Sequence, residues 1–88
     1  MGSREQAANI INTIASQAQA VWGDRWIAEL VRRYCEIESI ESGKGIKPVQ
    51  RRSQLVRALE EKTCELTTLM RLLQATGIEI ELYVKQKL

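Results

Sequence analysis

The stretch RRSQLVRALEEKTCELTTLMRLLQATG, residues 51–77, decides the fold class because it holds two successive apolar stripes at helical spacing. In its first half Leu55, Ala58 and Leu59 recur every three or four residues. This period places them on one side of a helix. The pattern predicts a helix that begins at residue 49 or 50 and ends at residue 62.

The second half of this stretch predicts another helix, from residue 64 to residue 75. Thr63 is expected to be its N-cap, since a hydroxyl oxygen accepts a bond from a free N–H of the first turn. Gly77 is expected to end it, because glycine readily adopts the left-handed conformation that follows a helix. Its apolar face comprises Leu66, Leu69, Met70, Leu72 and Leu73.

Two more amphipathic segments precede this region and predict an N-terminal helical hairpin over residues 5–40. They are separated at Gly23-Asp24, where glycine ends one helix and aspartate begins the next. Trp22 and Trp26 flank this corner and are expected to anchor the core. The apolar positions of the first segment are Ala7, Ile10, Ile11, Ile14, Ala18 and Val21. Those of the second are Trp26, Ile27, Leu30, Val31, Tyr34 and Ile37.

Residues 41–49 are expected to form a basic loop, because Ser42, Gly43, Gly45 and Pro48 all favour loops over helix. The run Ser-Gly-Lys-Gly within it is superficially similar to a phosphate-binding loop. The complete glycine-lysine pattern and a preceding strand are both missing. Nucleotide hydrolysis is therefore not expected.

After Gly77 the apolar period changes to two, which indicates a half-buried strand over residues 78–85. Its apolar side chains are Ile78, Ile80, Leu82 and Val84. No second alternating run exists to pair with it, and an unpaired strand leaves its backbone donors and acceptors open. Pairing with the same strand of a second subunit would satisfy them. The alternatives are a frayed tail or an extension of the preceding helix.

The expected fold is therefore one mainly α domain over residues 1–88, with four to five helices. Residues 50–77 form its helix-turn-helix-like part. The C-terminal strand is expected to pair across a homodimer.

Composition argues against catalysis. The chain has no histidine, so the commonest general base and metal ligand is missing. Cys35 and Cys64 stand far apart, without disulfide or metal spacing, and are expected to be structural. No catalytic residue, metal, cofactor or small-molecule substrate is expected. No apolar run approaches the roughly 18 residues that cross a bilayer, and we expect a cytoplasmic protein with no membrane partner.

The net charge is only +2, but the positive charge is concentrated. Residues 42–59 contain no acid and span the predicted loop and the start of the following helix. Lysine and arginine attract phosphate backbones, while Arg, Gln and Ser read base edges. The predicted DNA-binding residues are Lys44, Lys47, Arg51, Arg52, Ser53, Gln54 and Arg57. The alternative is a solvated face that serves solubility.

Residues 51–62, followed by 66–78, resemble the second half of lambda-repressor-like (Xre-type) helix-turn-helix domains. The quoted residues match a recognition helix and the helix after it. The tail Ile78-Glu79-Ile80-Glu81-Leu82 resembles the strand of antitoxin-like members, which often dimerise. The resemblance implies that Arg51, Arg52, Ser53, Gln54 and Arg57 fall where recognition-helix contacts lie. Leu55, Leu69, Leu72 and Leu73 fall at core positions.

Two functions remain open at this stage. The first is a dimeric DNA-binding transcriptional regulator, with Arg51 and Gln54 reading bases and Arg52, Arg57, Lys44 and Lys47 holding phosphates. The second is a protein-interaction module, antitoxin or adaptor, that contacts a second protein through the N-terminal amphipathic helix. An enzyme is the least favoured class, since no complete motif or cluster of titratable groups is visible.

Overall fold

The computed structural model describes residues 3–78, and this part of the chain is mainly helical, as the sequence predicts. Its elements are α1 (Ser3–Trp22), the 3₁₀ turn η1 (Gly23–Arg25), α2 (Trp26–Ser42), α3 (Pro48–Glu61) and α4 (Leu66–Thr76). Residues 3–78 contain no strand. The strand predicted at 78–85 lies outside the described residues except for Ile78. None of the described helices is both long and apolar enough to cross a bilayer.

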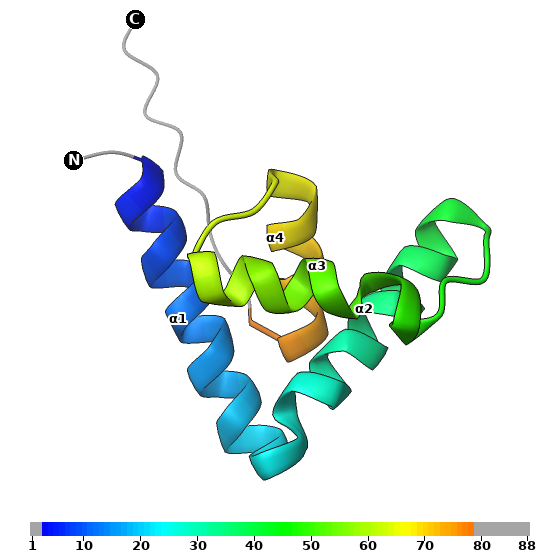
Figure 1. Ribbon diagram of the computed structural model, residues 1–88, viewed down its shortest axis with the longest axis horizontal. Coiled ribbons are helices and arrows are strands. Elements are labelled where there is room, and N and C mark those ends of the chain that lie inside the picture. Colours follow the sequence, from blue (N-terminus) through cyan, green and yellow to red (C-terminus); the bar gives the residue numbers. More distant parts are fainter. Residues whose placement is uncertain (1–2, 79–88) are drawn as a thin grey trace, which may run out of the picture.

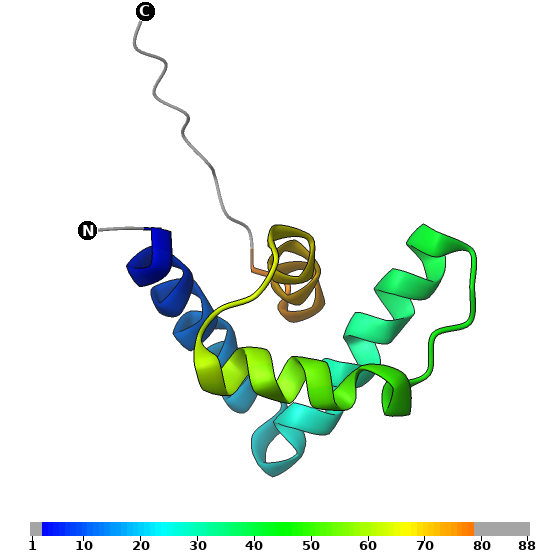
Figure 2. The ribbon, with the colours of Figure 1, turned by 45° about the horizontal axis from the view of Figure 1, so that its top comes forward.

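Helices α1 and α2 form a V that is joined at η1 (Figure 1). α3 crosses the V from one arm to the other, and α4 lies within its mouth (Figure 2). α2 packs against each of the other three helices, and α1 also contacts α4 and α3. This arrangement leaves one long side of α3 on the outside of the molecule.

All four helices contribute to one hydrophobic core. Its buried apolar side chains are Ile11, Ile14, Ala18, Leu30, Val31, Tyr34, Cys35, Leu55, Ala58, Leu59, Leu69, Leu72 and Leu73. Trp22 and Trp26 pack against this core and are half-buried, in keeping with their expected role as anchors. α1 therefore packs on its own domain, because its apolar side is taken up by the core.

Two glycines end helices in the left-handed conformation. Gly77, with φ of 74°, ends α4 as predicted, and its N–H donates to the Gln74 carbonyl at 3.2 Å. The Ile78 N–H donates to the Leu73 carbonyl at 3.0 Å, which completes a Schellman motif. Gly43, with φ of 71°, ends α2 by donating to the Ser39 carbonyl at 3.0 Å.

The basic loop is shorter than predicted, running over residues 43–47 rather than 41–49. α2 continues to Ser42 because Gly43, not Glu41, is the residue that adopts the left-handed conformation. α3 begins at Pro48, since proline fits the first helical position, where no N–H is needed. The Ser39 hydroxyl accepts the Ile46 N–H at 2.9 Å and holds the loop against α2.

The predicted start of the last helix is wrong. α4 begins at Leu66 rather than at residue 64, and its N-cap is Glu65, not Thr63. α3 ends where Lys62 adopts the left-handed conformation, with φ of 59°. Residues 63–65 then turn the chain towards α4 and are not part of either helix. No side-chain oxygen caps α4.

Leu72 and Leu66 provide a matched test of this packing, because both are leucines of α4 with opposite exposure. Leu72 is fully buried and Leu66 is 69% exposed. Leu72→Ala should lower the free energy of unfolding by about 3 kcal/mol through lost burial and a residual cavity. Leu66→Ala should change it by less than about 0.5 kcal/mol. Urea denaturation followed by circular dichroism measures both, and equal losses would contradict the described core.

Candidate nucleic-acid interface

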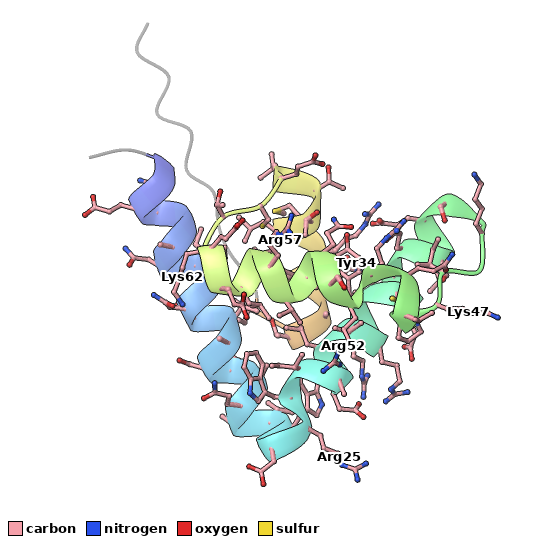
Figure 3. All side chains as sticks on the ribbon, viewed as in Figure 1. Arg25, Tyr34, Lys47, Arg52, Arg57 and Lys62 are labelled. Atoms are coloured by element: carbon pink, nitrogen blue, oxygen red, sulfur yellow. The ribbon has the colours of Figure 1, made fainter. Side chains whose placement is uncertain are left out.

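Six of the predicted DNA-binding side chains are exposed, and they lie along α3 and the loop before it. They are Lys44, Lys47, Arg52, Ser53, Gln54 and Arg57. Figure 3 labels Lys47 at the loop end of α3, with Arg52 and Arg57 farther along the helix. The structure thus places these six residues on two neighbouring elements, the loop 43–47 and α3.

The outer side of α3 carries the polar members of this group. Ser53, Gln54 and Arg57 are related by three and four residues, the spacing at which side chains share a helix face. Arg52 projects from a different side, about 140° around the helix from Arg57. A shallow depression lies between these positions, lined by Arg52, Ser53, Val56, Arg57 and Glu60. Glu60 is therefore the acid that marks the end of the basic surface.

Four cations of this surface have no ionic partner within residues 3–78. The ammonium groups of Lys44 and Lys47 and the guanidinium groups of Arg52 and Arg57 form none of the ion pairs or side-chain hydrogen bonds found within residues 3–78. Lys44 and Lys47 donate only their backbone N–H groups, to Ser42 and Gln50. Their charges are not neutralised internally, so they are available to an anionic partner. We call these four residues the open cations.

The N-terminus of α3 adds to this positive surface. Gln50 accepts a hydrogen bond from the Lys47 N–H through Oε1 at 2.8 Å, which fixes the entry of the chain into the helix. The aligned peptide dipoles place a partial positive charge at this end. No acid lies in the first turn to cancel it. Lys47 and Lys44 therefore stand beside a helix terminus of the same sign.

Arg51, the seventh predicted residue, is placed differently. Its guanidinium donates to both carboxylate oxygens of Glu38 in α2, from Nε to Oε1 at 2.8 Å and from Nη2 to Oε2 at 2.7 Å. Glu38 is only 8% exposed. Arg51 lies one turn before the buried Leu55, so it is aligned with the inner side of α3. Its guanidinium is engaged in this ion pair, so we do not propose Arg51 as a base-reading residue.

A second arginine joins this buried pair to α4. Arg71 donates from Nε to Oε1 of Glu41 at 2.6 Å and from Nη1 to the Tyr34 hydroxyl at 3.2 Å. Its Nη1 also lies 3.9 Å from Oε1 of Glu38. The resulting network of Tyr34, Glu38, Glu41, Arg51 and Arg71 connects three helices.

The opposite charges in this network stabilise one another. The hydrogen bonds from Arg51 lower the pKa of Glu38, against the opposing effect of burial, and the charge of Arg71 lowers it further. The bonds to Glu41 and Tyr34 raise the pKa of Arg71. Glu38 and Arg71 are thus both stabilised in their charged forms.

Sequence reasoning missed this network, although a signal was present. Glu38 follows Leu30 and Tyr34 at intervals of four, so a carboxylate occupies a position in the apolar stripe of α2. Arg51 likewise continues the stripe of α3 towards its N-terminus. Charged residues in register with a buried stripe indicate ion pairs between helices, because a buried charge needs a partner.

The other reactive side chains within residues 3–78 include two free cysteines, Cys35 and Cys64. Burial raises the pKa of both Cys35 and Cys64 thiols, which favours their protonated, unreactive form. A second depression lies between α3 and the start of α4, and Cys64 is among the residues that line it. No group of three His, Cys, Asp or Glu side chains with metal-binding geometry exists in this part of the chain.

Comparisons with known proteins identify no relative. No protein family, no curated protein and no solved structure matches this chain. The geometry of the site is therefore the basis for assigning a function.

Replacing Glu38 tests the network. Glu38→Gln should lower the free energy of unfolding by about 2–3 kcal/mol at neutral pH, because Arg51 loses its buried counter-charge. Glu36→Gln is the control, since the Glu36 side chain is 55% exposed and lies 3.4 Å from Arg32. That change should cost less than about 0.5 kcal/mol.

The same pair of proteins tests the pH dependence. The pKa of Glu38 is lowered in the folded state, so its stabilisation is complete above its ordinary value of 4.5. It should disappear as the pH falls through the lowered folded-state pKa. The difference in unfolding free energy between the wild type and Glu38→Gln should therefore shrink in acid. A difference that is independent of pH would contradict the ionised pair.

Proposed function

We propose that this domain binds double-stranded DNA through α3 and the loop 43–47, and that it acts as a transcriptional regulator. The observation that carries the proposal is the set of open cations on a surface whose sequence, residues 42–59, has no acid. Phosphate backbones bind such surfaces by releasing condensed counterions.

The open cations nearest the start of α3 suit phosphate binding. Lys44 and Lys47 are exposed residues of the loop. Figure 3 shows Lys47 there and Arg52 on one side of the helix. Contacts of this kind fix the position and orientation of a protein on the duplex without reading its sequence. The partial positive charge at the helix N-terminus favours the same anions.

Ser53, Gln54 and Arg57 are the residues that we assign to base reading. They lie together on the outer side of α3, and their side chains suit the donors and acceptors of base edges. The 14 residues of α3 form a helix about 21 Å long. The major groove is about 12 Å wide and admits one α-helix. α3 is exposed along this side, which supports its entry into the groove.

The resemblance to Xre-type helix-turn-helix domains is part of the proposal and rests on residues 51–78 alone. α2, the loop and α3 supply the two helices and the connection that this motif requires. Dimerisation through the C-terminal strand also stays a prediction, since Ile80, Leu82 and Val84 lie outside the described residues. Ile78 packs against the core of its own domain, so less of its side chain is exposed for contact with a second subunit.

The alternative function, a protein-interaction module, needs a binding surface different from the one that the sequence predicts. It was predicted from the amphipathic pattern of the N-terminal helix. Ile11, Ile14 and Ala18 are fully buried in the core, so this apolar side is occupied. A protein partner would have to bind the polar side of α1 instead.

Reversal of one open cation tests DNA binding. Arg57→Glu should weaken binding to a duplex by at least about tenfold at low ionic strength, because it removes one attraction and adds a repulsion. Fluorescence anisotropy with a labelled random-sequence duplex measures the change. Unchanged affinity would refute the assignment of α3.

The matched control is Arg25→Glu, which makes the same change in net charge. Arg25 is exposed at the corner between α1 and α2, away from Lys47 and Arg57 (Figure 3). We expect the affinity of this variant for the duplex to stay within about twofold of the wild type, since Arg25 is not one of the proposed contact residues. Equal losses in both variants would show that net charge, not this surface, governs binding.

A further inference from the structure

The outer side of α1 carries no charged residue over most of its length. Residues 6–23 contain no charged side chain, and all 13 basic and 11 acidic residues lie outside this run. The exposed positions of α1 include Asn9, Asn12, Thr13, Ser16 and Gln19. A helix that faced only solvent would be expected to carry charges, which form roughly a quarter to a third of soluble surfaces.

Helix stability does not explain these residues. Asn, Ser and Thr are weaker helix formers than Lys, Glu or Ala, and exposed positions are where packing leaves that choice free. Residues 6–22 of α1 also form no ion pairs between positions four apart, because this stretch contains no charged residue. The outer side of α1 is thus filled with short polar groups at the expense of propensity. Such residues lose little on desolvation when another surface supplies hydrogen-bond partners.

We propose that this uncharged side of α1 binds a second copy of the same chain about a two-fold axis. In such an interface each patch meets itself, so every charge on it would lie near its own copy. An uncharged patch avoids this like-charge repulsion, whereas a different protein would offer opposite charges and would not require neutrality. Charge is also depleted at the centres of protein interfaces in general.

The position of α1 fits this assembly. Its buried side faces α2, α3 and α4, so its polar side points away from the domain. The loop 43–47 lies at the opposite edge of the molecule (Figure 1). A two-fold axis beside α1 therefore leaves this loop, with the open cations Lys44 and Lys47, uncovered in both copies. The inference does not depend on DNA binding, and its test contains no DNA.

The test introduces like charges at the centre of the patch. Asn12→Glu and Ser16→Glu place a carboxylate near its own copy and should raise the dimer dissociation constant at least about tenfold. Glutamate is a better helix former than either residue, so α1 itself remains stable. Gln74→Glu, at an exposed position of α4, is the control and should leave the dimer unchanged. Sedimentation equilibrium of the full chain measures the constants, and circular dichroism verifies folding.

A mixing experiment tests whether the partner that binds the outer side of α1 is a second copy of the chain. Asn12→Glu and Asn12→Lys should each be monomeric alone and should form a heterodimer when mixed, because opposite charges then meet across the axis. A wild type that is monomeric at micromolar concentration would overturn the proposal. So would a dimer that survives Asn12→Glu but is lost in Ile80→Lys, since that result would assign dimerisation to the C-terminal segment.

Discussion

Glu38 of α2 and Arg51 of α3 form a bidentate ion pair at 2.8 and 2.7 Å, in a place from which most solvent is excluded. Two parallel hydrogen bonds between planar groups fix orientation as well as distance. Together with the buried Leu55, Ala58 and Leu59, the pair therefore helps to fix the orientation of α3 on α2. Arg71 of α4 donates hydrogen bonds to Glu41 and Tyr34 of α2, so the same network also holds α4 against α2. The side of α3 that remains outside is a consequence of these buried contacts.

The acid-free residues 42–59 thus contain two kinds of basic side chain, which the fold directs to different places. Arg51 points inward, where a carboxylate of α2 neutralises it. Lys44, Lys47, Arg52 and Arg57 stay outside without an ionic partner among residues 3–78. A buried ion pair helps to orient the helix, and we propose that the exposed charges bind anions. One helix can therefore be both rigidly placed and strongly basic.

Much of this arrangement follows from local patterns in the sequence. The stripe of Leu55, Ala58 and Leu59 correctly identified the inner side of α3, and Gly77 correctly marked the end of α4. The start of α4 was misplaced because capping residues such as Thr63 are informative only when the chain direction before the helix is known. The pairing of Arg51 with Glu38 was not predicted, for a related reason. Glu38 lies 13 residues before Arg51, on another helix, and only the crossing of α2 and α3 brings the two together.

Salt dependence tests the central claim most directly, since the proposed affinity of the outer side of α3 for DNA arises from ionic contacts. If the open cations Lys44, Lys47, Arg52 and Arg57 each neutralise one phosphate, the slope of log Kobs against log salt should be about −3 to −4 per protomer. Binding of the wild-type chain to a random duplex over a salt titration provides this slope. A slope near zero, or no binding at the lowest salt, would contradict the account.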